Sequence, residues 1–223
     1  MGFKVAIDGP SGVGKSTLAK GLAARFGFLH LDTGAMYRAC GLYLIGLGAA
    51  FSDNAAAVEA LRGMDIRVEL GADGQRVFIN ERDFTPVLRT PDGDHASSAA
   101  GKVRAIREEL VARQRAIAAG RDVVLDGRDI GTVVLPDAEV KLFLTAGAGI
   151  RAARRAAENA AKGIASDPAE TLSEIERRDY ADTHRAHSPL AKAADAVEID
   201  TSAMSADEVL AAAAAIIEEK RGG

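Results

Sequence analysis

Short apolar runs alternate along this chain with longer stretches in which apolar residues recur at helical spacing. The short runs are bounded by polar residues or glycine and have the length of buried strands: 3–8, 28–32, 123–126, 140–144 and 196–200. Helical spacing follows Lys15 and covers about 34–47 and 102–119. The alternation predicts an α/β fold, with a mostly parallel sheet and helices on both of its faces.

Two further helices are predicted from the residues at their N-termini. Asp167 stands before Pro168, with Glu170 three residues on, which predicts an N-cap, a first helical residue and a capping box. Ser205 and Glu208 repeat the spacing of the capping box, and the glycines near the end of the sequence predict where that helix ends.

In one segment, apolar and polar residues instead alternate with a period of two. Between residues 65 and 84 the apolar positions that alternate with polar ones are Ile66, Val68 and Leu70, and then Val77 and Ile79. The pattern is interrupted by "GADG", a typical turn, and so predicts an antiparallel hairpin. We assign 62–90 to an antiparallel insert. Two interpretations stay open: an insertion with a small hydrophobic face, and a mobile flap.

Composition restricts the class of protein. A length of 223 residues suits a single domain over 1–223. The 28 basic and 32 acidic side chains give a net charge of −4, which argues against a nucleic-acid partner. No apolar run has the length of a membrane span, so no membrane partner is expected. Cys40, in an apolar helical pattern, is expected to be a small buried hydrophobe, and the chain to be a cytoplasmic monomer.

A phosphate-binding loop is predicted directly after the first strand. The sequence "GPSGVGKS" satisfies G-x-x-x-x-G-K-[ST] and lies between a strand and a helix, as a P-loop requires. Glycines let backbone amides turn toward phosphate oxygens, and the helix presents its positive N-terminus at the same place. The residues expected to bind ATP are Gly9, Pro10, Ser11, Gly12, Val13, Gly14, Lys15, Ser16 and Thr17.

The metal expected with ATP is Mg²⁺, with Ser16 as a ligand beside the nucleotide phosphates. Asp126, at the end of the third candidate strand, has two interpretations: an acid that holds Mg²⁺ through water, or an aspartate that caps the following loop. A GTPase normally also carries D-x-x-G and [NT]-K-x-D, and neither string occurs here. A small kinase is therefore the leading class.

A kinase that phosphorylates an anionic acceptor needs a second site with positive charge. Arg38 and Arg128 follow the second and third candidate strands. Ligands of open α/β sheets bind at the carboxyl ends of the strands, so these two arginines are favourably placed.

Four segments together resemble the bacterial cytidylate kinase family: "DGPSGVGKST", "LDTGAMYR", "DGRDIGTVVLPDA" and "ERRDYADTHRAHSPL". The resemblance runs from Val5 to about Asp200. It implies a P-loop kinase fold with a five-stranded parallel sheet, a monophosphate-binding region that contains the insert, and a helical lid at about 148–167. It also implies transfer of the γ-phosphoryl group of ATP to CMP or dCMP, giving ADP and CDP or dCDP.

The same resemblance implies roles for individual residues. It assigns the acceptor phosphate to Arg38, Arg128 and Arg185. It assigns the cytosine edge to Ser98, Arg107 and Asp129. It assigns the ribose and the pocket wall to Arg178, Asp182, Asp32, Tyr37 and Thr33. Relatives commonly carry serine at the position of Thr33, which keeps the hydroxyl, and "PDGDHAS" at 91–97 departs from the family pattern.

No general base is expected. The second pKa of a phosphate monoester is about 6, so the acceptor oxygen is already largely ionised at neutral pH. Catalysis then depends on positioning two anions and neutralising their charge, and the residues expected to do so are Lys15, Arg128, Arg154 and Arg155. Both Arg154 and Arg155 are expected to lie near ATP. Adjacent helical residues do not share a face, so one of them is expected to reach the transferring phosphoryl group and the other to bind elsewhere. Two rivals remain: another small P-loop kinase, such as a shikimate kinase, and a regulatory module that binds ATP without turnover.

Overall fold

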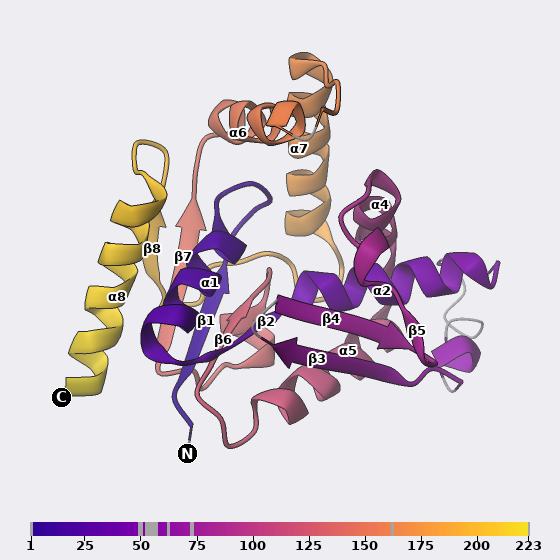
Figure 1. The fold of residues 1–223 in the computed structure, drawn as a ribbon, viewed down its shortest axis with the longest axis horizontal. Helices are drawn as coiled ribbons and strands as arrows, with labels where there is room; N and C mark the ends of the chain where they lie inside the picture. Colours follow the sequence, from indigo (N-terminus) through magenta and orange to yellow (C-terminus); the bar gives the residue numbers. More distant parts are fainter. Residues whose placement is uncertain are drawn as a thin grey trace.

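The structure is a computed structural model that describes residues 2–48, 51, 58–61, 63–71, 74–161 and 163–222. All five candidate strands are confirmed: β1 (Lys4–Asp8), β2 (Leu29–Asp32), β6 (Val123–Asp126), β7 (Val140–Thr145) and β8 (Val197–Asp200). They form a parallel sheet in the order β2-β6-β1-β7-β8. Figure 1 shows this sheet at the centre of the molecule, with helices on both sides.

Alternate residues of the strands face two separate hydrophobic clusters. In β1, Val5 and Ile7 belong to the cluster that holds α1 (Lys15–Phe26) and α8 (Ala206–Gly222), whereas Ala6 belongs to the other. Successive side chains of a strand point to opposite faces, so an apolar run is buried on both sides. This explains why the central strands β1, β6 and β7 are largely apolar.

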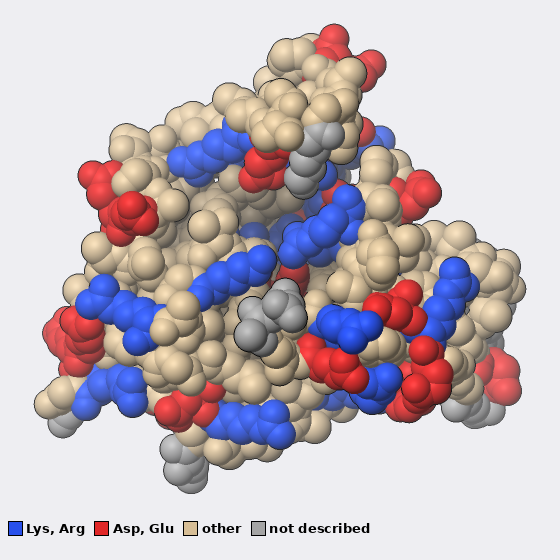
Figure 2. All heavy atoms as spheres, viewed as in Figure 1, with Lys and Arg blue, Asp and Glu red and all other residues tan. Residues whose placement is uncertain are grey.

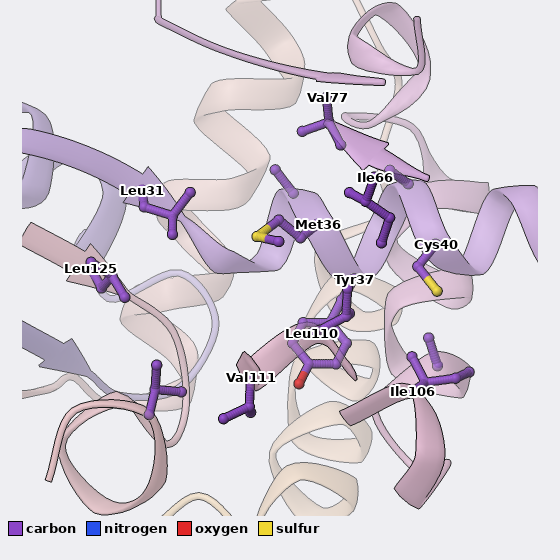
Figure 3. Close-up of a cluster of buried hydrophobic side chains, with 14 of the residues drawn as sticks. Leu31, Met36, Tyr37, Cys40, Ile66, Val77, Ile106, Leu110, Val111 and Leu125 are labelled. Atoms are coloured by element: carbon purple, nitrogen blue, oxygen red, sulfur yellow. The ribbon is translucent and has the colours of Figure 1, made fainter. Parts of the chain in front are cut away.

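The second cluster packs α2 (Thr33–Gly46) and α5 (Arg104–Ala118) against the sheet. Figure 3 shows Met36, Tyr37 and Cys40 of α2 between strand residues and the side chains of α5. Cys40 is fully buried, which confirms the expectation of a small core residue. Burial also raises the pKa of its thiol to about 12.

The antiparallel insert is present as β3 (Ile66–Gly71), β4 (Gly74–Ile79) and β5 (Arg82–Asp83). Its apolar side chains join the second cluster, and Figure 1 shows the small sheet beside α2. The boundary at 62 and the middle of the expected turn, 72–73, lie outside the described residues.

A glutamine attaches the insert to the parallel sheet. The Gln75 amide donates to the backbone oxygen of Asp32 (3.0 Å) and accepts from its backbone nitrogen (2.7 Å). It therefore pairs with the end of β2 as another strand would. Together with the buried apolar face, this contact favours a packed insertion over an independent flap.

Four helices and turns complete the described fold around the site. They are α4 (Pro91–Ala100), the π-helical turn η2 (Ile130–Val134), α6 (Ala148–Ala161) and α7 (Pro168–His184); a 3-10 turn, η1 (Thr85–Val87), follows the insert. Neither α4 nor η2 was expected from the sequence. The residue at 162, within the expected lid, lies outside the described part of the chain.

The two predicted N-caps are confirmed. The Asp167 carboxylate accepts from the amides of Ala169 and Glu170, and Ser205 and Glu208 bond each other reciprocally. None of the helices among the described residues combines the length and apolar character needed to cross a bilayer.

Candidate active site

A cleft of about 590 Å³ opens at the carboxyl ends of the parallel strands. Asp32 at the end of β2 lies in register with Asp126 at the end of β6, and Asp126 lies beside Ile7 of β1. Segments distant in the sequence therefore meet here, as expected for an open α/β sheet. Figure 2 shows the hollow below the α6 region, with Lys and Arg side chains gathered around it.

The P-loop has the geometry that its glycines predict. Gly9, Gly12 and Gly14 have φ angles of +144°, +80° and +94°, a region that side chains with a Cβ rarely adopt. Gly14 has no side chain to cap α1, so the first amides of the helix remain available to an anion.

Lys15 is a buried cation with 7% of its surface exposed. Its ammonium donates to the backbone oxygen of Pro10 within the loop (2.6 Å). Burial, together with the positive charge of Arg128, lowers the pKa of Lys15 well below its ordinary value. A phosphate group in the cleft would add negative charge beside this ammonium group.

Ser16 and Asp126 meet at the floor of the cleft. The Ser16 hydroxyl donates to Oδ2 of Asp126 (2.7 Å), and His30 Nε2 lies 2.7 Å from Oδ1 of the same carboxylate. Burial raises the pKa of Asp126, but the bonds from His30 and Ser16 outweigh burial and the pKa is lowered. The carboxylate is thus ionised and held beside the serine.

This pair suits Mg²⁺. Both groups offer oxygen atoms, and Mg²⁺ usually takes one or two protein oxygens and completes its shell with phosphates and water. Among the described residues no cluster of three or more acidic, histidine or cysteine side chains could hold a metal without such partners. The role of Asp126 toward Mg²⁺ stays a prediction.

Asp8, the last residue of β1, holds the segment "DGRDIG" (126–131) next to this strand. Its two carboxylate oxygens accept from the amides of Ile130 and Gly131, each at 2.7 Å. Burial raises the pKa of Asp8 to about 6, although these hydrogen bonds oppose the rise. The contact sets where Arg128 and Asp129 enter the cleft.

The arginines assigned to the acceptor phosphate and ribose have carboxylate partners in this structure. Arg128 Nε donates to Asp182 (2.7 Å). Arg38 Nη2 and Arg178 Nη1 both donate to Oδ1 of Asp94, at 3.0 and 3.2 Å. Each arginine is therefore directed into the cleft by an acidic side chain.

The residues assigned to the cytosine edge form a buried corner. Arg107 Nη2 donates to Asp129, and Arg185 Nη2 lies 3.5 Å from the other oxygen of that carboxylate. Burial raises the pKa of Asp129, and the two guanidinium groups oppose the rise. Among the described residues, neither Arg107 Nε nor the Tyr37 hydroxyl has a hydrogen-bond partner, although both are buried. Unsatisfied buried polar groups beside a cleft are suited to a polar ligand.

Most of the candidate residues line this one cleft: Ser11, Gly12, Gly14, Lys15, Ser16, Thr17, Asp32, Thr33, Tyr37, Arg38, Ser98, Arg107, Asp126, Arg128, Asp129, Arg155, Arg178, Asp182 and Arg185. Gly9, Pro10 and Val13 belong to the P-loop without lining it. Two of the lining residues are also used within the fold, because the Thr33 hydroxyl donates to the Asp126 backbone oxygen and Asp32 caps α2.

The two lid arginines point in different directions. Arg155 lines the cleft and donates to Oδ2 of Asp94 (3.0 Å). Arg154 instead donates to the backbone oxygen of Thr201 (2.6 Å) and to its hydroxyl (3.1 Å), at the end of β8. The structure thus brings Arg155, and not Arg154, to the site.

The residues around the cleft that were not singled out from the sequence include Arg151, His30 and Asp94. Arg151 precedes Arg155 by four residues, the spacing of one helix face, and donates to the Ser11 backbone oxygen (3.1 Å). That spacing was a usable signal. His30 and Asp94 carried none, because their partners Asp126, Arg38 and Arg178 are distant in the sequence.

Comparisons with known proteins identify the family. The sequence model described as Cytidylate kinase matches residues 5–219. A cytidylate kinase from Geobacillus sp. (strain WCH70) is 46% identical over 220 residues, which is 99% of this chain and 98% of the relative. One from Lactiplantibacillus plantarum is 46% identical over 219 residues, 98% of this chain and 96% of the relative.

A solved structure agrees with the fold. An uncharacterised protein from Eubacterium ventriosum superposes with a TM-score of 0.52 at 15% identity, over the full length of both chains. This likeness supports the arrangement of elements alone. The sequence relatives cover nearly the whole chain, and the cleft holds the P-loop and the arginines expected of a kinase: the chain belongs to the cytidylate kinase family.

Proposed function

We propose that this enzyme transfers the γ-phosphoryl group of ATP to CMP or dCMP, giving ADP and CDP or dCDP. One observation carries the proposal. The P-loop and the buried corner of Arg107 and Asp129 open into the same cleft, and Arg128, which precedes Asp129 in the sequence, lines it and acts electrostatically on both Lys15 and Asp129. A phosphate donor site and a polar, base-sized site are thus joined by positive charge.

The charges favour in-line transfer between two anions. Lys15 would neutralise the β- and γ-phosphates of ATP, and Arg155 would approach the transferring group from the lid. Arg38, Arg128 and Arg185 would hold the acceptor phosphate. The acceptor oxygen is already ionised, so positioning and electrostatic stabilisation suffice, and no side chain is needed as a general base.

Ser16 and Asp126 would hold Mg²⁺, Ser16 directly and Asp126 through water, with His30 orienting the carboxylate. When bound, the ion would supply positive charge that neutralises part of the charge of the donor phosphates.

The buried corner suits cytosine better than uracil. The amino group at C4 of cytosine is a donor, and N3 and O2 are acceptors. Asp129 as a carboxylate accepts only, and Arg107 donates only. Uracil would place its O4 against the carboxylate and its N3–H against the guanidinium. Mismatched buried polar contacts of this kind discriminate by up to about 10⁴. Ser98, which lines the cleft, can adapt to either role.

ADP release with a panel of acceptors tests the proposal. CMP, dCMP, UMP, AMP and shikimate would each be supplied with ATP and Mg²⁺ in a coupled assay. CMP and dCMP should be far better substrates than the other three. Equal use of shikimate would favour the rival small kinase. ADP release that no acceptor changes would favour an ATPase, and binding of ATP without turnover would favour a regulatory module.

A further inference from the structure

Asp94 occupies the centre of the arginines that surround the acceptor site. Its Oδ1 accepts from Arg38 on α2 (3.0 Å) and from Arg178 on α7 (3.2 Å). Its Oδ2 accepts from Arg155 on α6 (3.0 Å). All four side chains line the cleft. One carboxylate on α4 therefore binds arginines from three other helices.

The role of Asp94 in its own helix does not explain this arrangement. The N-terminus of α4 is capped by the Thr90 hydroxyl, which accepts from the Gly93 amide (3.2 Å). Asp94 turns away from that cap toward the cleft. Burial raises its pKa, but Arg38, Arg178 and Arg155 more than offset burial, and the pKa falls to about 2. The group is a permanent anion in the working pH range.

The charge count matches a phosphate monoester. Three guanidinium groups and one carboxylate leave a net charge of +2 on this cluster. A phosphate monoester carries −1.5 to −2 at pH 7. Carboxylate and phosphate oxygens accept from the same N–H donors at the edge of a guanidinium group, so the two anions compete for these donors.

We infer that Asp94 is a built-in anion of the arginine cluster, that the acceptor phosphate displaces it from Arg38, the arginine shared with the proposed phosphate site, and that this displacement releases Arg155, and with it α6, from α4. The inference rests on the proposed acceptor site and adds a coupling to it. Figure 1 shows α6 above the carboxyl ends of β1 and β7, and α4 on the side of α2. The contact between Asp94 and Arg155 thus ties the lid to the monophosphate-binding region. Acceptor binding would free the lid arginine for the transferring phosphoryl group.

Asp94→Asn tests the inference, with Asp92→Asn as the matched control. Asp92 lies in the same turn of α4 and is exposed, so the control removes the same charge without touching the cluster. Inorganic phosphate and CMP binding would be measured by calorimetry. Asp94→Asn should tighten both by roughly tenfold, because one charged competitor is gone. Asp92→Asn should leave both nearly unchanged. Weaker binding by Asp94→Asn would overturn the inference, since the carboxylate would then orient the arginines for the phosphate.

Tighter phosphate binding by Asp94→Asn could also result from the loss of charge repulsion alone. Hydrogen exchange of the α6 amides in the nucleotide-free protein therefore tests separately whether the contact between Asp94 and Arg155 holds α6. Asp94→Asn should exchange faster than the wild type over 148–161, and Asp92→Asn should not. Arg155→Gln breaks the same contact from the other side and should also exchange faster, which keeps the test open if one variant folds poorly. Unchanged exchange in both variants would overturn the release of the lid.

These measurements need neither ATP nor turnover. If the enzyme fails to phosphorylate CMP, the proposed function falls, while phosphate binding and exchange still decide the role of Asp94. If CMP is phosphorylated and Asp94→Asn weakens phosphate binding, only the present inference falls.

Discussion

Lys15 is a buried cation to which the proposed function assigns the neutralisation of phosphate charge. Its single described hydrogen bond goes to the Pro10 backbone oxygen, and burial lowers its pKa. We expect Lys15→Met to reduce kcat by a factor on the order of 10²–10³ or more. The free energy of unfolding should stay equal or rise, because a buried charge is replaced by an apolar chain of similar length. Lys220→Met on α8 is the control.

Both quantities are measured on the same preparation, by ADP release and by urea unfolding. Near-normal turnover in Lys15→Met would exclude a role of this P-loop in phosphoryl transfer. If activity and folded protein were lost to the same extent, the role of Lys15 would be structural.

Arg107 provides the second prediction at the scale of the residue. Arg107→Met should lower kcat/KM for CMP by about 10²–10³ and for UMP by less than about tenfold, because only cytosine gains from a donor at this position. Arg104→Met, an exposed arginine on the first turn of the same helix, should change neither. Removing Arg107 also leaves Asp129 with one guanidinium partner fewer, so folding is checked by circular dichroism. Equal losses with CMP and UMP would show that Arg107 does not read the base.

At the scale of the element, the orientation of α6 determines which of two adjacent arginines faces the cleft. On α6, Arg155 enters the cleft, and Arg154 attaches the helix to Thr201. Arg155→Ala should lower kcat by a factor on the order of 10²–10³. Arg154→Ala should lower the free energy of unfolding by about 1–3 kcal/mol, because Thr201 loses charged donors, with little change in kcat. Turnover and urea unfolding on both variants form the test, and a reversed pattern would refute the assignment.

The Asp8 carboxylate at the end of β1 accepts hydrogen bonds from the first amides of η2. The pKa of Asp8 is about 6 in the fold and about 3.9 in unfolded chains, so the folded state holds the proton more tightly. Its contribution to stability is full below pH 4 and is lost as pH rises through 6. Asp8→Asn removes this titration and sets an amide donor against the amide of Ile130 or Gly131.

Urea unfolding at pH 5 and pH 8 measures this contribution. The variant should be less stable at both values, by about 1–3 kcal/mol at pH 5. The difference between the two proteins should shrink by roughly 1–2 kcal/mol from pH 5 to pH 8. A difference that stays constant or grows with pH would show that the Asp8 pKa is not raised.

At the scale of the whole molecule, the cleft lies between the sheet, α4 and the two helices α6 and α7. A site assembled from separate elements is completed only when both substrates bind, which protects ATP from water. We expect slow ADP release with ATP alone and a steep rise when CMP is added. Rates with and without CMP decide this, and a CMP analogue that lacks the phosphate serves as the control. High ADP release without an acceptor would contradict closure.

The strands, the P-loop, the hairpin and the N-caps could be predicted because each follows from neighbouring residues. "GPSGVGKS" specifies its own loop, and the alternation of Ile66, Val68 and Leu70 specifies a strand. The helix α4 escaped notice because Gly93 and the polar residues of "PDGDHASS" give no apolar stripe; its formation depends on packing against α2. The monomeric state and the cytoplasmic location remain predictions.

By itself, the sequence determined the five strands of the parallel sheet, the antiparallel insert, the phosphate-binding loop and the family, because these depend on local patterns and on motifs read along the chain. Only the tertiary structure decided that Arg155 and not Arg154 enters the cleft, that His30 holds Asp126, and that Asp94 gathers three arginines. The physical reason is distance along the chain: Arg38, Asp94, Arg155 and Arg178 span 140 residues, and Asp94 lies 84 residues before Arg178. No local propensity encodes such a contact, which arises when separate helices are packed onto one edge of a sheet.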